Sequence, residues 1–261
     1  MSRGYGAISC AYDSFNGEVD YAAWADFAER CFATYLPARP SLVLDLACGT
    51  GTLTELLSER GYDMTGVDAS PEMLSVARER CSENTLLLCQ NMCAFELYGT
   101  VGATICSLDS LNHLTRKGEL EKCFSLVHNY LDPDGIFLFD VNSAYRFNTE
   151  YARESYQFED ELDDGRAVFC NWQNDYSEKR GICRFYITLF TESAAGSGIY
   201  SRSDEEWSER YYSREELTAA LEGAGFEVLG IFGSTNMRPP RKNDSKLYFA
   251  ARAKKINMEV N

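Results

Sequence analysis

Two aspartates, Asp45 and Asp68, lie where acids could bind an adenosine-containing cofactor. Asp45 is close to the end of a short apolar run at residues 42–46 and is followed by two glycines, Gly49 and Gly51. Asp68 ends a second run, 17 residues after Gly51. Glycines let the backbone turn tightly and approach a ligand where a helix begins, and an acid at the tip of the next strand can bind ribose hydroxyls. The pattern therefore predicts an adenosine-binding site.

A second polar stretch, from Ser107 to His113, follows a later apolar run. The carboxyl ends of parallel strands frame the ligand crevice of such a sheet, so the reacting group should lie here. His113 could accept a proton from a nucleophile, because histidine titrates near neutral pH. The alternative is a loop histidine that only packs against its neighbours.

The elements that must position these residues alternate between strand and helix. An amphipathic helix is expected over 20–35, where Tyr21, Trp24 and Phe27 recur at helical spacing. Short apolar runs after it predict strands, and the segments between them predict helices. The expected strands are 42–46, 64–67, 85–88, 103–106 and 136–139, the expected helices are 52–60, 71 onward and 117–130, and residues 132–135 are expected to form a turn. This alternation favours a parallel sheet with right-handed crossovers.

The pattern changes after Asp140. Residues 156–212 show the alternation of strands without intervening helices, which predicts a small inserted antiparallel sheet. Ser213 and Glu216 form a capping box that starts another helix. The apolar runs at 228–232 and 247–251 predict the final two strands.

The composition limits the partners and the location. The chain has 261 residues, ten cysteines and a formal net charge of −15. No run approaches the ~18 apolar residues of a membrane span, and the first residues lack the apolar segment of a secretory signal. The scattered cysteines indicate reduced core residues and not a disulfide framework or a zinc site. We therefore expect a cytoplasmic protein that binds no membrane, no metal and no nucleic acid, the last because its charge is acidic.

Three stretches carry a resemblance to a known family. They are residues 45–51 (Asp-Leu-Ala-Cys-Gly-Thr-Gly), 66–74 (Gly-Val-Asp-Ala-Ser-Pro-Glu-Met-Leu) and 109–114 (Asp-Ser-Leu-Asn-His-Leu). In this order they resemble the class I S-adenosylmethionine-dependent methyltransferases, in particular those that act on small molecules, including amino-sugar and glycine-type N-methyltransferases. The resemblance is strong over about residues 40–140 and weaker at the end of the chain.

The resemblance implies a doubly wound α/β fold. Its sheet has seven strands, is mostly parallel and Rossmann-like, and has a last strand that runs antiparallel to its neighbours. We accordingly expect three parts: an N-terminal cap segment and helix at 1–36, a Rossmann-like methyltransferase core at 37–143 plus 213–255, and an inserted antiparallel substrate lid at 144–212.

The resemblance also implies which residues bind S-adenosylmethionine. Asp45 is suited to the ammonium group of the cofactor, and backbone groups of Ala47 and Gly49 would line its methionine part. Gly51 completes the turn, and Asp68 would accept from both ribose hydroxyls.

The adenine would lie against residues of the next two elements. Ala69 and Met73 would pack on the ring, although a methionine at a helical position can equally be plain core. Asn91 and Met92 follow the third strand, where relatives usually place an aspartate that accepts from the adenine amino group. An asparagine carbonyl can accept the same hydrogen bond. The alternative for Asn91 is a residue of a loop turn.

The stretch after the fourth strand would face the reacting methyl group. Ser107 and Asp109 are assigned to the cofactor and Asn112 to the acceptor, and His113 is the candidate base.

Aromatic residues near the N-terminus and one arginine complete the expected site. Tyr12 and Trp24 would close over the cofactor and Tyr5 over the substrate, because aromatic faces suit a sulfonium or an ammonium. The alternative is that the helix with Trp24 simply packs on the sheet. Arg210 could pair with an anionic group of the substrate, or form a surface ion pair with the acids at 204–206.

The function expected from these features is in-line transfer of a methyl group from S-adenosylmethionine to a small molecule, with nitrogen as the favoured acceptor atom. A protein that binds the cofactor without catalysis is one alternative. A nicotinamide-dependent oxidoreductase is another, but the chain lacks its third glycine. We expect a monomer or a homodimer.

Overall fold

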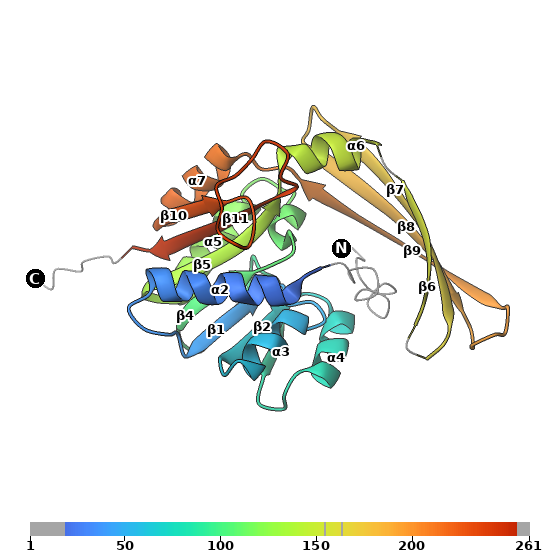
Figure 1. Ribbon diagram of the computed structural model, residues 1–261, viewed down its shortest axis with the longest axis horizontal. Helices are drawn as coiled ribbons and strands as arrows, with labels where there is room; N and C mark the ends of the chain where they lie inside the picture. The colour runs from blue at the N-terminus through green and yellow to red at the C-terminus, as the bar shows by residue number, and fades with distance from the viewer. Residues whose placement is uncertain (1–18, 154, 163, 255–261) are drawn as a thin grey trace, which may run out of the picture.

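The computed structural model describes residues 19–153, 155–162 and 164–254 (Figure 1). The predictions for Tyr5 and Tyr12 lie outside the described residues. The described chain forms a layered core and a separate antiparallel sheet that projects from one side of it (Figure 1).

Seven strands form the sheet of the core, in the order β10-β11-β5-β4-β1-β2-β3. Their bounds are β1 (Leu42–Leu46), β2 (Asp63–Asp68), β3 (Leu86–Cys89), β4 (Val101–Cys106), β5 (Leu131–Asn142), β10 (Phe226–Phe232) and β11 (Lys246–Ala253). The first five pair in parallel, whereas β11 is antiparallel to both of its neighbours. The prediction of a doubly wound, mostly parallel sheet with an antiparallel last strand is confirmed.

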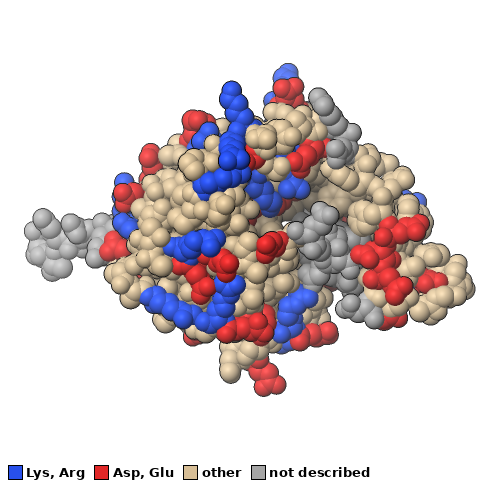
Figure 2. Space-filling model, in the orientation of Figure 1, with Lys and Arg blue, Asp and Glu red and all other residues tan. Residues whose placement is uncertain are grey.

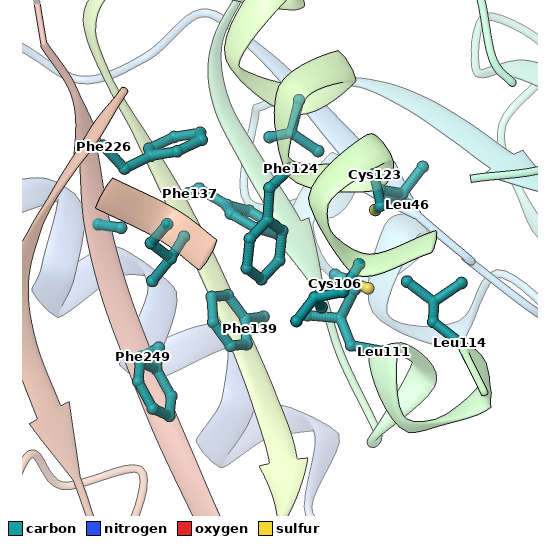
Figure 3. Close-up of a cluster of buried hydrophobic side chains, with 14 of the residues drawn as sticks. Leu46, Cys106, Leu111, Leu114, Cys123, Phe124, Phe137, Phe139, Phe226 and Phe249 are labelled. Carbon is teal, nitrogen blue, oxygen red and sulfur yellow. The ribbon is translucent and has the colours of Figure 1, made fainter. Parts of the chain in front are cut away.

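Helices cover both faces of this sheet, because side chains of each strand point alternately to the two faces. Their bounds are α2 (Tyr21–Tyr35), α3 (Thr52–Glu59), α4 (Pro71–Arg80), α5 (Glu119–Tyr130) and α7 (Arg214–Gly223). Along β5, Phe137 and Phe139 pack in one hydrophobic cluster with α5 and α7, and Ile136 and Leu138 pack in the other with α2 and α3. Figure 3 shows the first cluster, in which Phe139 stacks on Phe249 of β11 with ring centroids 4.9 Å apart.

The second sheet, called the lid here, contains four consecutive antiparallel strands. They are β6 (Tyr156–Glu161), β7 (Ala167–Ser177), β8 (Ile182–Glu192) and β9 (Tyr200–Arg210). Cys183, Phe185, Ile187 and Leu189 of β8 are buried, as their alternation in the sequence predicted. A π-helical segment, η2 (Arg146–Glu150), and the short helix α6 (Tyr151–Arg153) lead into the lid and were not predicted.

One predicted turn is wrong. Residues 132–135 lie inside β5, which begins at Leu131. Leu131 pairs with Val101 before Asp134, where φ is 62°, and Ile136 pairs with Ala103 after it. The strand thus absorbs the turn-forming residues as an irregularity, because β4 offers partners on both sides of it. Among the described residues, no helix has the length and apolar character needed to cross a membrane.

Candidate functional site

The glycine loop that follows β1 has a strongly curved backbone. Ala47, Gly49 and Gly51 have φ values of 61°, 56° and 77°, and Gly51 is the N-cap of α3. A Cβ atom at Gly51 would lie 2.7 Å from the sulfur of Cys81, so the loop can approach α4 only with glycine there. A Cβ atom at Gly49 would meet nothing within 4 Å, so this side of the loop is open toward a ligand.

Asp68, at the end of β2, holds the glycine loop in place. Its Oδ2 accepts from the backbone N–H of Gly49 at 2.9 Å, and its Oδ1 accepts from the N–H of Ser70 at 2.8 Å. Burial raises the pKa of the carboxyl, and the backbone N–H groups of Ser70, Gly49 and Ala69 act in the opposite direction. A carboxylate oxygen can accept more than one hydrogen bond, so the geometry fits the binding of ribose hydroxyls.

Asp45 is buried beneath the same loop. Its Oδ2 accepts from the hydroxyl of Thr54 at 2.6 Å, while Oδ1 has no hydrogen-bond partner within the described part of the chain. Burial raises the pKa of this carboxyl to about 7; the Thr54 hydrogen bond lowers it and the charge of Asp68 raises it. A buried oxygen of this kind calls for a cationic or donating partner. The acid therefore fits the ammonium group of S-adenosylmethionine.

The residues predicted to contact adenine lie in different surroundings. Ala69 is exposed, whereas Met73 is buried in the cluster that α4 shares with the lid. Asn91 uses its Oδ1 to accept from the N–H of Cys93 at 2.8 Å, which is a turn contact, and Met92 packs against the core. A role for these residues at the adenine remains a prediction.

A second group of polar residues lies where β4 and β5 end and β11 begins. Asp140 of β5 is fully buried and accepts from the indole N–H of Trp24 at 2.9 Å and from Lys246 at 2.8 Å. Lys246 also pairs with the carboxylate of Asp109. Trp24 packs edge-on against Phe27, so the contacts of Trp24 are those of a helix that packs on the sheet. The sequence analysis missed Asp140 and Lys246, because no local spacing links them.

Asn112 connects the core to the lid. It is fully buried, its Oδ1 accepts from the backbone N–H of Asn142 at 2.9 Å, and its Nδ2 donates to the carbonyl of Arg210 at 2.7 Å. These contacts join η1 (Ser110–His113), β5 and β9. The role of Asn112 toward an acceptor remains a prediction.

Arg210 does not pair with the acids at 204–206, so that alternative is wrong. It forms an ion pair with Glu216 at 2.5 Å and lies over the ring of Tyr212, with its Cζ 4.6 Å from the centroid. The reason is local: Ser213 caps α7 and brings Glu216 back toward the end of β9. Asp204 pairs with Arg202 instead.

Ser107 and His113 border two different cavities. Ser107 is buried and, with Cys48 and Gly49, lines a cavity of about 30 Å³ at the glycine loop. His113 lines a cavity of about 870 Å³ whose other walls include Tyr186 and Arg202 of the lid. The two cavities share no lining residue among those described.

The electrostatic surroundings keep His113 neutral. Burial lowers the pKa of His113, and the negative charge of Asp109 opposes this effect. Burial would raise the pKa of Asp109 itself, but Lys246 and Arg146 hold it below its usual range, so Asp109 is charged. In the described part of the chain, no group of three or more His, Cys, Asp or Glu side chains could hold a metal ion.

Comparisons with known proteins agree with this geometry. A family model described as a methyltransferase domain matches residues 43–135. Over 254 residues the chain is 28% identical to YqeM of Bacillus subtilis (strain 168), which its name describes provisionally as a methyltransferase; the match covers 96% of this chain and 98% of that protein. It is 28% identical over 219 residues to the dTDP-3-amino-3,4,6-trideoxy-alpha-D-glucopyranose N,N-dimethyltransferase of Streptomyces venezuelae, covering 84% of this chain and 89% of that enzyme.

A solved structure is similar to this chain over nearly its whole length, including the lid. An S-adenosylmethionine-dependent methyltransferase from Clostridium acetobutylicum ATCC 824 has a TM-score of 0.81 and 28% identity, covering 96% of this chain and 99% of that one. The match decides against the nicotinamide-dependent alternative. The chain is therefore an S-adenosylmethionine-dependent methyltransferase, similar in sequence and fold to the class I enzymes, and S-adenosylmethionine is its cofactor.

Proposed function

We propose that this methyltransferase acts on a small molecule and transfers the methyl group to an amine nitrogen. The observation that carries the proposal is the cavity of about 870 Å³ at His113, which is lined from both the core and the lid. Cavities that bind small molecules usually have ~300–1,000 Å³, so an acceptor of that class fits.

The chemistry of His113 supports nitrogen as the acceptor atom. S-adenosylmethionine supplies a methyl group on a positively charged sulfur. An amine can attack only through a free lone pair, so an ammonium acceptor must lose a proton. The lowered pKa of His113 leaves its imidazole neutral at pH 7 and able to take that proton. Asp109, charged and close to His113, would stabilise the imidazolium that forms.

The relatives support the same class of acceptor. The Streptomyces venezuelae relative is, by its name, an N,N-dimethyltransferase of an amino sugar. A local match points elsewhere: 65 residues, or 24% of this chain, are 40% identical to the 18S rRNA (guanine-N(7))-methyltransferase bud23 of Schizosaccharomyces pombe. The formal net charge of −15 argues against RNA. On the face shown in Figure 2, acidic side chains gather on the lid while the core carries both signs.

Methyl transfer to a panel of small amines, acids, phenols and a structured RNA tests the proposal. We expect an amine to gain a methyl group, detected by mass. His113→Ala should lower kcat by about 100-fold and leave the affinity for S-adenosylhomocysteine unchanged. The matched control is His128→Gln, because His128 packs in α5 against Phe226. Methylation of RNA or phenols alone, or full activity of His113→Ala, would contradict the proposal.

The remaining assignments belong to the same proposal. We infer that residues 1–36 act as a cap, that 37–143 plus 213–255 form the catalytic core, and that the inserted segment at 144–212 closes over the acceptor. A monomer or homodimer in the cytoplasm is the expected state. Limited proteolysis and sedimentation of the full chain test the division and the oligomeric state.

A further inference from the structure

The buried carboxylate of Asp140 accepts hydrogen bonds from four donors. Its Oδ1 accepts from the indole N–H of Trp24 at 2.9 Å and from the backbone N–H of Leu108 at 2.7 Å. Its Oδ2 accepts from the backbone N–H of Asp109 at 3.1 Å and from the ammonium of Lys246 at 2.8 Å. A carboxylate with four donors makes strong, charge-assisted hydrogen bonds, so Asp140 fixes the position of all four groups.

Two of these donors belong to the methyl-transfer loop, defined here as residues 107–113. Leu108 and Asp109 have φ values of 53° and 55°, which is the left-handed region that side chains disfavour by ~1–2 kcal/mol per residue. Two successive N–H groups in such a turn can point at one anion. The carboxylate of Asp140 occupies that position and offsets the strain.

The turn determines where the rest of the loop lies. Ser107 precedes it and lines the cavity at the glycine loop. The 3₁₀ helix η1 (Ser110–His113) follows it and ends at His113, which lines the larger cavity. A change of the backbone at Leu108 and Asp109 would therefore move the cofactor side and the acceptor side of the loop relative to each other.

The other two donors anchor Asp140 to distant parts of the chain. Trp24 lies in α2, 116 positions away, and Lys246 begins β11, 106 positions away. Burial would lower the pKa of Lys246, but Asp109 and Asp140 raise it, so its ammonium stays charged. The cation of Lys246 thus balances the charge of Asp140 inside the protein.

We propose that Asp140 is a positioning residue for methyl transfer, which holds the methyl-transfer loop in its left-handed turn and so aligns His113 with the cofactor. Asp140 acts through the backbone of Leu108 and Asp109. The proposal rests on the methyltransferase family and is independent of which acceptor the enzyme uses.

Hydrogen exchange of the full chain, followed by mass spectrometry, tests this without an acceptor. In Asp140→Asn the peptides that contain residues 107–113 should exchange at least about tenfold faster, because two charge-assisted bonds are lost. The affinity for S-adenosylhomocysteine, measured by calorimetry, should change less than about threefold, since the glycine loop and Asp68 are untouched. With an acceptor in hand, kcat should fall by about 10- to 100-fold, as expected for misplaced reacting groups.

The matched control is Glu192→Gln in the lid. Glu192 is also buried and also accepts from backbone N–H groups, those of Ala167, Gly196 and Gly198. This variant should leave the exchange of the methyl-transfer loop unchanged. If Asp140→Asn does not fold, Trp24→Phe removes one donor of Asp140 that lies outside the loop and should speed the same exchange by a smaller factor. Unchanged exchange in a folded Asp140→Asn would overturn the proposal, and so would a cofactor affinity that falls as much as kcat does.

Discussion

The two ends of the candidate site are built in different ways. At the cofactor end, the glycine loop, Asp45 and Asp68 lie in one strand–helix–strand unit, β1-α3-β2. At the methyl-transfer end, two of the four groups that bind Asp140, those of Trp24 and Lys246, lie more than 100 positions from it along the chain. The first end is encoded by spacing along the chain, and the second by the packing of the whole fold.

The two ends also differ in the hydrogen-bond partners of their buried carboxylates. Asp45 has one carboxyl oxygen without a partner in the described residues, whereas Asp140 has four donors, one of them a cation. An unpaired buried acid favours a cationic ligand, and a fully bonded one favours a rigid structure. The cofactor end is thus suited to binding and the methyl-transfer end to alignment.

Asp68→Ala should have the largest effect and tests the cofactor end. It removes the acceptor for the ribose hydroxyls and the bonds to Gly49 and Ser70, so the Kd for S-adenosylhomocysteine should rise about 100-fold or more in calorimetry. The matched control is Asp63→Ala, an exposed acid at the other end of the same strand, which should bind normally. Equal affinities in the two variants would show that ribose is not bound at β2.

Asp45→Asn should lower the affinity for S-adenosylhomocysteine about tenfold above pH 7, because the ammonium group loses a charged partner.

Asp45 has a pKa of about 7 in the fold, against an ordinary value of 3.8. Its contribution to stability is therefore complete below pH 3.8 and is lost as the pH rises through about 7. Above that pH the free Asn variant should be more stable than the parent, by roughly 1–2 kcal/mol in thermal unfolding.

A loss of stability in this variant at high pH, measured without cofactor, would mean that the carboxylate is stabilised by the protein itself. Thermal unfolding of Thr54→Val, measured without cofactor over the same range of pH, serves as a comparison. That variant removes the one hydrogen bond that lowers the pKa of Asp45 and should steepen the loss of stability with rising pH.

Glu209→Gln tests the contact between lid and core and should have a smaller effect. Glu209 is buried in the lid and accepts from Asn142 at 2.8 Å and from Tyr151 at 3.3 Å. Burial and then the charge of Asp109 raise its pKa to about 8, from an ordinary 4.5, so its contribution to stability disappears as the pH rises through about 8. The melting temperature of the parent should fall between about pH 7 and pH 9, and that of the Gln variant should fall less.

Arg202→Ala should have the smallest effect. The ion pair of Arg202 with Asp204 is largely exposed, with 60% and 58% of the two side chains accessible, so its loss should leave the stability of the protein nearly unchanged. The midpoint of chemical denaturation measures this. A clear fall of the midpoint in the variant would show that the lid depends on its surface charges.

The difference between the two ends explains what the sequence could predict. The parallel strands, the glycine loop and Asp68 follow from local patterns of apolar residues, glycines and acids. The antiparallel last strand was implied by the resemblance to the methyltransferases. Asp140 and Lys246 could not be predicted, because each is an ordinary charged residue at a strand end until β5 and β11 pair. The ion pair of Arg210 was assigned to the wrong acids, since the capping box of α7 decides which one comes close. The turn at 132–135 failed because pairing with β4 overrides local turn preference.

The structure of the full chain with bound S-adenosylhomocysteine tests the central claim most directly. We expect the ribose hydroxyls within hydrogen-bond distance of both oxygens of Asp68, and the ammonium group beside Oδ1 of Asp45. Adenosine density away from the carboxyl ends of β1 and β2, with both acids unchanged in their contacts, would contradict the account.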